Sequence, residues 1–155
     1  MPTEAAHREI QTLDVRQEIR IAAPVEISFQ ALLEELGPGS ELPDGTHFPM
    51  KIEPRPGGRW YRDLGNDAGH LWGHVQVIKP PSLLELTGPM FMSYPAVSHV
   101  QYRLTPEAGG TLLKLVHRAF GQIPPDDLEG VDEGWSHGLG RVRRIAEGKA
   151  ASAHQ

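Results

Sequence analysis

The chain has 155 residues, a length that fits one domain able to bury roughly two-thirds of the surface of its unfolded chain. Fifteen basic against twenty acidic residues give a net charge of −5, and the densest basic run, Arg141-Val142-Arg143-Arg144, is short, so we do not expect nucleic-acid binding. There is no cysteine, which excludes disulfides, thiolate catalysis and cysteine-ligated zinc.

The N-terminal part of the chain predicts a strand followed by a helix. We expect residues 1–13 to form a flexible tail. Apolar and polar residues alternate from Val15 to Ile21, which predicts a strand. Pro24 suits the first turn of a helix, where its missing N–H would have no partner. Apolar residues then follow at helical spacing from Val25 to Leu36, and Gly37-Pro38-Gly39 ends the helix.

The middle of the chain predicts a series of antiparallel strands. The strand-like segments are separated by Gly-Gly, Gly-Asn-Asp and Pro-Pro, which is typical of a meander. They cover residues 46–53, 58–64, 70–79 and 83–87. Two further segments, 97–105 and 111–120, predict a hairpin around Pro106 to Gly110.

This hairpin has the clearest alternation in the sequence. Val100, Tyr102 and Leu104 alternate with His99, Gln101 and Arg103. In the partner strand, Leu113, Leu115, His117 and Ala119 share a face, and Lys114 and Arg118 lie on the other. Because charged side chains face water in a half-buried sheet, His117 is expected to point inward.

Asp126 to about Glu147 predicts a long last helix with acidic residues in its first turn. Its apolar stripe is Val131, Trp135, Leu139, Val142 and Ala146. Gly130, Gly134 and Gly138 share another face, although each glycine costs roughly 1 kcal/mol against alanine in a helix interior. That face therefore either packs closely on the sheet or leaves volume for a cavity. Residues 149–155 are expected to form a second flexible tail.

His70 and His74 flank Trp72 and are the most obvious candidates for metal ligands. Residues i and i+4 of a strand lie roughly 13 Å apart, too far to share one ion. The other face is apolar, so both histidines are expected to face solvent, and no metal site is predicted. The apolar face consists of Leu71, Gly73, Val75 and Val77.

The order of strand, helix, antiparallel strands and long helix excludes a doubly wound parallel sheet. Several short sequences in this order resemble the START-like superfamily, also called SRPBCC or helix-grip. Within it the chain is most similar to the activator-of-heat-shock-protein-90-ATPase homologue domain family. The matching segments are Ile21–Glu26, Pro56–Arg59, Gly73–Pro81 with Leu86-Thr87, Gly110–His117 and Gly134-Trp135.

The resemblance spans roughly residues 14–147 and implies a single domain over residues 14–148. The implied fold is α+β, with a curved antiparallel sheet of about six or seven strands around the long C-terminal helix. A short helix follows the first strand.

The resemblance also implies that the protein binds a small hydrophobic or lipid-like molecule between the sheet and the C-terminal helix. We expect this binding role rather than catalysis, with no cofactor. The residues predicted to contact the ligand are Trp60, Tyr102, Leu113, Leu115, His117, Trp135 and Gly138.

Two other functions stay open. The first is an enzyme like the polyketide cyclases or dehydratases of the superfamily, with His117 as the acid–base residue. The second is a co-chaperone or protein-interaction module acting on heat-shock protein 90. It ranks third because 155 residues leave no room for the separate N-terminal domain of the eukaryotic co-chaperone. A homodimer is a further open alternative.

The location is also an expectation. Residues 1–9 lack the apolar core of a signal peptide, and no segment approaches the roughly 20 apolar residues of a membrane span. We therefore expect a cytoplasmic protein.

Overall fold

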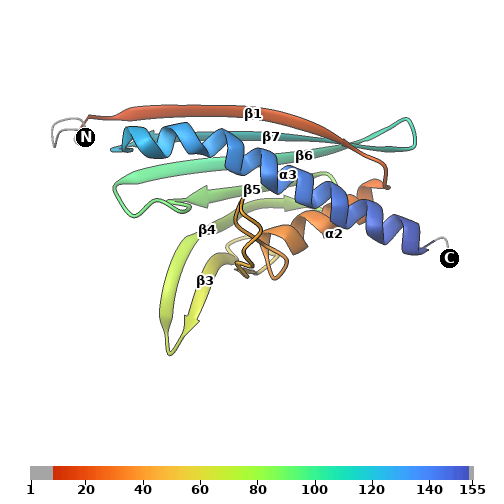
Figure 1. The fold of residues 1–155 in the computed structure, drawn as a ribbon, viewed down its shortest axis with the longest axis horizontal. Coiled ribbons are helices and arrows are strands. Elements are labelled where there is room, and N and C mark those ends of the chain that lie inside the picture. The colour runs from red at the N-terminus through yellow and green to blue at the C-terminus, as the bar shows by residue number, and fades with distance from the viewer. Residues whose placement is uncertain (1–8, 154–155) are drawn as a thin grey trace.

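The computed structural model describes residues 9–153, which form a seven-stranded sheet curved around one long helix (Figure 1). Every neighbouring pair of strands is antiparallel, in the order β1-β7-β6-β5-β4-β3-β2. The strands are β1 (Gln11–Ile21), β2 (Lys51–Ile52), β3 (Arg59–Gly65), β4 (Ala68–Lys79), β5 (Leu83–Gly88), β6 (Ala96–Glu107) and β7 (Gly110–Gly121). The helices are α2 (Val25–Leu36) and α3 (Pro125–Ala153). The predicted helix-grip fold is confirmed.

Regular structure extends further toward both ends than the sequence indicates. β1 begins at Gln11, which pairs with Gly121 of β7. Leu13 packs against a small apolar cluster that includes Met92 and Ile123, which explains the early start. α3 continues to Ala153 because Ala150, also buried, extends its apolar stripe. Residues 11–13 and 149–153 are thus strand and helix rather than the expected tails. The other expected tail residues, 1–8 and 154–155, lie outside the described residues.

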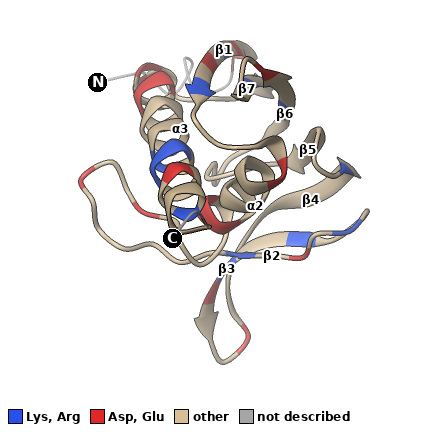
Figure 2. Cartoon of the chain, turned by 90° about the vertical axis from the view of Figure 1, so that its right-hand side faces the viewer, with Lys and Arg blue, Asp and Glu red and all other residues tan. Residues whose placement is uncertain are grey.

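The two helices lie side by side on the concave face of the sheet (Figure 2). The main core forms where the inward side chains of the strands meet α2 and the C-terminal half of α3. Leu32, Leu113 and Val142 are among its fully buried members. Each such side chain contributes about 1.5–3 kcal/mol through removal of apolar surface from water. The Trp60 indole Nε1 donates a 2.7 Å hydrogen bond to the Leu36 carbonyl oxygen, which fixes the end of α2 to β3.

β4 departs from the alternation that the sequence predicts. Trp60 pairs with Gly73 and Tyr61 with Leu71, so Trp72 is the extra residue of a β-bulge. The bulge turns Trp72 toward the concave face and leaves Leu71 48% exposed. The prediction that Leu71 lies on the buried face is therefore wrong. His70 and His74 are both exposed, as expected.

The hairpin of β3 and β4 projects beyond the two helices (Figure 1). Its far part therefore has no helix to cover its inner face. Among the described helices, none is long and apolar enough to cross a membrane.

Candidate ligand-binding cavity

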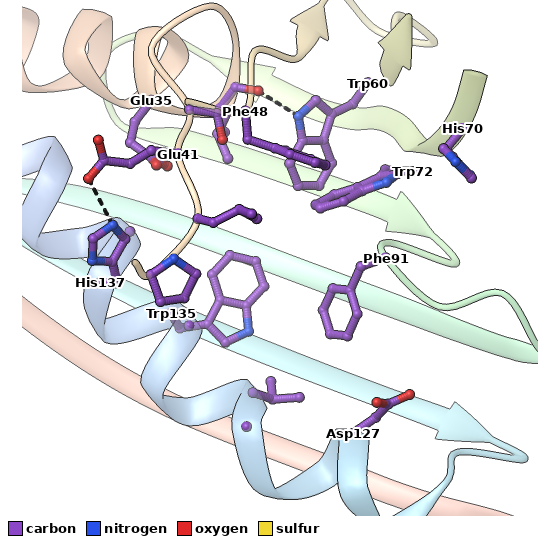
Figure 3. A pocket seen from close by; sticks show the side chains of 18 of the residues that line it. Glu35, Glu41, Phe48, Trp60, His70, Trp72, Phe91, Asp127, Trp135 and His137 are labelled. Carbon is purple, nitrogen blue, oxygen red and sulfur yellow. Dashed lines mark hydrogen bonds and ion pairs between the residues drawn. The ribbon is translucent and has the colours of Figure 1, made fainter. Parts of the chain in front are cut away.

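A cavity of about 570 Å³ lies between the N-terminal half of α3 and the β3–β4 side of the sheet (Figure 3). Its other walls are the end of α2, parts of the connection between residues 40 and 48, and the loop that follows β5. Sites for small molecules commonly measure about 300–1,000 Å³ and are mostly apolar. The volume therefore suits a ligand of a few fused or linked rings.

Aromatic rings form one wall of this cavity (Figure 3). Trp72 is at their centre, with ring centroids 5.2 Å from Trp60, 6.1 Å from Phe48 and 6.0 Å from Phe91. These separations are typical of favourable edge-to-face and tilted aromatic contacts. Trp72 lines the cavity because the β-bulge turns it inward. A single sequence carries no clear signal for that bulge, so Trp72 is not among the residues predicted to contact a ligand.

The glycine stripe of α3 forms the opposite wall. Gly130, Gly134 and Gly138 all line the cavity. A methyl group added at Gly130 or Gly134 would meet nothing within 4 Å, and one at Gly138 would lie 3.6 Å from an oxygen of Glu35. Of the two explanations left open by the sequence, close packing and cavity volume, the structure supports cavity volume.

Trp135 lies between Gly134 and Gly138 in the sequence, and His117 contacts it on the side away from the cavity. Its indole Nε1 donates a 2.8 Å hydrogen bond to His117 Nδ1, and the rings meet edge to face with centroids 5.3 Å apart. His117 Nε2 lies 2.9 Å from Ser98 Oγ. Because Nδ1 accepts, the proton of the neutral imidazole is on Nε2 and is donated to Ser98. Burial lowers the pKa of His117 to about 4, which keeps the ring neutral at pH 7.

The residues predicted to bind the ligand separate into two groups. Trp60, Trp135 and Gly138 line the cavity. The others are buried beneath that lining, and their contact with a ligand stays a prediction. They are Tyr102, Leu113, Leu115 and His117. The predicted inward orientation of His117 is confirmed, but Trp135 stands between it and the cavity.

Acidic side chains supply much of the polar lining, and two of them, Glu41 and Asp127, have side-chain partners. Glu41 Oε1 lies 3.0 Å from His137 Nε2 and 3.6 Å from Arg141 Nε. Asp127 accepts a hydrogen bond from the Tyr94 hydroxyl, and burial, followed by this contact, raises the pKa of Tyr94. In the part of the chain that the structure describes, no three His, Asp or Glu side chains gather as a metal site.

Glu35 differs from these acids. It lines the cavity, is only 8% exposed, and makes no hydrogen bond or ion pair with any described residue. Burial raises the pKa of its carboxyl to about 8; Arg141 lowers the pKa and Glu41 raises it. Glu35 is not among the residues predicted to contact a ligand. Its spacing carried a signal, because it lies three residues after Leu32 and so next to the apolar stripe of α2.

Comparison with known protein families assigns the chain to one of them. The model of the family described as "Activator of Hsp90 ATPase homolog 1-like protein" matches residues 40–147. The chain belongs to this family. Among curated protein sequences, none matches the chain.

Solved structures include other proteins with this fold. An activator-of-Hsp90-ATPase-homolog-1-like protein from Rhizobium etli is 27% identical, with a TM-score of 0.56 over 89% of this chain and 84% of that chain. An uncharacterized protein from Rhizobium leguminosarum is 16% identical, with a TM-score of 0.66 over 90% and 97% of the two chains. The di-domain ARO/CYC StfQ from the steffimycin biosynthetic pathway is 13% identical, with a TM-score of 0.62 over 90% of this chain and 52% of that chain. The latter two likenesses concern the fold alone.

Proposed function

We propose that this member of the activator-of-Hsp90-ATPase-homolog-1-like family binds a small hydrophobic or lipid-like molecule in the cavity beneath α3. The observation that carries the proposal is the glycine stripe. Gly130, Gly134 and Gly138 line an aromatic-walled space of about 570 Å³, although each costs the helix roughly 1 kcal/mol relative to alanine. A purely structural helix at this position gains from a larger residue at Gly134, because this glycine is half-buried and a methyl group there would meet nothing within 4 Å. Gly130 is exposed where it lines the cavity.

The lining supports an apolar ligand of modest affinity. Burial of about 200 Å² of apolar ligand surface contributes about 5 kcal/mol before the loss of ligand freedom is subtracted. Stacking on aromatic side chains such as Trp72 and Phe91 adds about 0.5–1.5 kcal/mol for each ring contact. A dissociation constant in the micromolar range is the expected outcome for a ligand that makes these contacts alone.

Catalysis of the cyclase or dehydratase kind ranks second. The likeness to StfQ concerns the fold, and both ring nitrogens of His117 are occupied by Ser98 and Trp135. These contacts suit a residue that positions Trp135 better than one that transfers a proton to a substrate. Interaction with heat-shock protein 90 rests on the name of the family and stays a prediction.

The test is to fill the cavity from the glycine side. An apolar fluorescent dye is titrated into the wild-type protein, Gly134→Leu and Gly148→Leu. Gly148 is the matched control, because it lies on the same helix, is exposed and does not line the cavity. We expect Gly134→Leu to weaken dye binding about 10-fold or more, and Gly148→Leu to leave it unchanged. A wild-type protein that binds no dye, or equal binding by the two variants, would contradict the proposal.

A further inference from the structure

Glu35 is the one acidic side chain of the cavity lining that is both deeply buried and without a partner among the described residues. It lies one residue before the end of α2, facing the middle of α3 (Figure 3). Gly138 stands opposite, and a methyl group there would lie 3.6 Å from Glu35 Oε2. Because Gly138 has no side chain, the carboxyl is open to the cavity rather than covered by the helix.

The charged and titratable groups around Glu35 contact other residues, although Arg141 Nε is buried without a hydrogen-bond partner. Arg141 and His137 of α3 both approach Glu41, and Arg141 Nη2 also donates a 2.8 Å hydrogen bond to the Gly39 carbonyl oxygen. Tyr102 of β6 lies close enough for the Glu35 charge to raise its pKa, after the larger effect of burial. None of these groups forms a hydrogen bond or ion pair with Glu35, although Arg141 and Glu41 influence its charge.

This environment makes Glu35 a hydrogen-bond donor at neutral pH. Burial raises the pKa of its carboxyl to about 8, so the protonated form predominates at pH 7. A protonated carboxyl has one O–H to donate. The carboxyl oxygens are not sealed off by protein atoms, and a ligand that brings an acceptor oxygen into the cavity gains a hydrogen bond worth about 0.5–1.5 kcal/mol.

The rest of the lining selects against negatively charged ligands. Besides Glu35, the cavity is lined by Glu41, Asp126 and Asp127, and no described lining residue is Lys or Arg. Carboxylate and phosphate groups would therefore meet these acidic groups, while Arg141, the cation whose charge acts on Glu35, approaches Glu41 and does not line the cavity. The remaining surface is largely aromatic and accepts a flat apolar body.

We propose that Glu35 is the polar anchor of this cavity and donates a hydrogen bond to the carbonyl oxygen of an uncharged, otherwise apolar ligand. This inference rests on the proposed function, because it requires the cavity to be the ligand site. It adds the chemical class of the ligand: a neutral ketone or ester with an aromatic or polycyclic body, in preference to a fatty acid or another anion.

The experiment compares four naphthalene probes of similar size: the hydrocarbon, a neutral methyl ketone, the carboxylate and the aminomethyl cation. Each is titrated into the wild-type protein, Glu35→Gln and Glu35→Leu. Glutamine keeps a neutral donor, whereas leucine keeps only the apolar bulk. Both variants remove a titratable group from a buried site, and circular dichroism verifies that they fold.

We expect the wild-type protein to bind the ketone about 10-fold more tightly than Glu35→Leu does, and Glu35→Gln to stay within about 3-fold of the wild type. The hydrocarbon should bind the wild type and Glu35→Leu within about 3-fold of each other, because it makes no polar contact. For the wild type, affinity for the ketone should fall as the pH rises through about 8, since the ionised carboxyl cannot donate. This fall should be absent in Glu35→Gln.

Three outcomes overturn the inference. If the ketone binds Glu35→Leu as tightly as it binds the wild type, Glu35 is not the anchor, while the cavity remains the ligand site. Tightest binding of the cationic probe, increasing with pH, would instead show an ionised Glu35 that pairs with amines. If none of the four probes binds, the hydrocarbon included, the cavity is not a ligand site, and the proposed function is contradicted together with this inference.

Discussion

The two halves of α3 lie against the same sheet but pack in opposite ways. The C-terminal half buries Val142, Ala146 and Ala150 in the core with α2. The N-terminal half presents Gly130 and Gly134 to a cavity in which a methyl group would meet nothing. The fold is therefore stabilised mainly at one end of the helix, and the other end is left available for a ligand.

The largest expected effect tests the packed half. Leu139 is 4% exposed and belongs to the main core. Leu139→Ala should lower the free energy of unfolding by about 2–5 kcal/mol, because it removes buried methyl groups and leaves a void. Urea denaturation measures the change, and Leu71→Ala on the exposed face of β4 is the control, with an expected effect within about 0.5 kcal/mol. A loss below about 1 kcal/mol at Leu139 would show that this half is also loosely packed.

The next largest effect tests His117, which holds Trp135 at the cavity wall, and it concerns the pH dependence of stability. His117 has a pKa of about 4 in the folded protein, below the value of about 6.5 expected for an unfolded chain. The unfolded state therefore binds the proton first, and stability that is present above pH 6.5 is lost as the pH falls toward 4. At about pH 4.5 the loss should approach 2–3 kcal/mol.

The matched variant for this measurement is His117→Gln, whose amide can accept from Trp135, donate to Ser98 and does not titrate. Urea denaturation of both proteins at pH 7 and about pH 4.5 gives the difference, in which the opposite contribution of Glu35 cancels. Equal pH dependence in the two proteins would mean that His117 is not the buried neutral group described above.

The smallest effect tests the N-terminal half of α3, which lines the cavity. Gly130→Ala should raise the free energy of unfolding by about 0.5–1 kcal/mol, because alanine favours the helix and its methyl group meets no neighbour. Gly148→Ala should give a similar gain at an exposed site of the same helix. A stabilised Gly148→Ala together with a destabilised Gly130→Ala would show that Gly130 is closely packed after all.

The sequence predicted the fold well, because its signals are local and repeated. Alternation in β6 and β7 placed His117 on the inner face, and helical spacing identified the glycine stripe of α3. The position of Trp72 could not be predicted in this way. It depends on an extra residue in β4, which reverses the alternation and is visible only in the pairing with β3.

The candidate site was predicted only in part for a similar reason. A cavity is defined by what several distant segments leave unfilled, and Glu35 acquires its properties from Gly138, more than one hundred positions away in the chain. Composition and spacing show that Glu35 is a helical acid, but not that it lacks a partner. Such information comes only from the packing of α2 against α3.

The placement of the aromatic residues has a practical consequence. The chain has three tryptophans, and all of them, Trp60, Trp72 and Trp135, line the cavity. Its intrinsic indole emission therefore originates entirely at the wall of the candidate site, with no background from tryptophans elsewhere. Entry of any aromatic compound changes the polarity and quenching around these rings. The unlabelled protein is thus its own optical sensor for whatever molecule it binds.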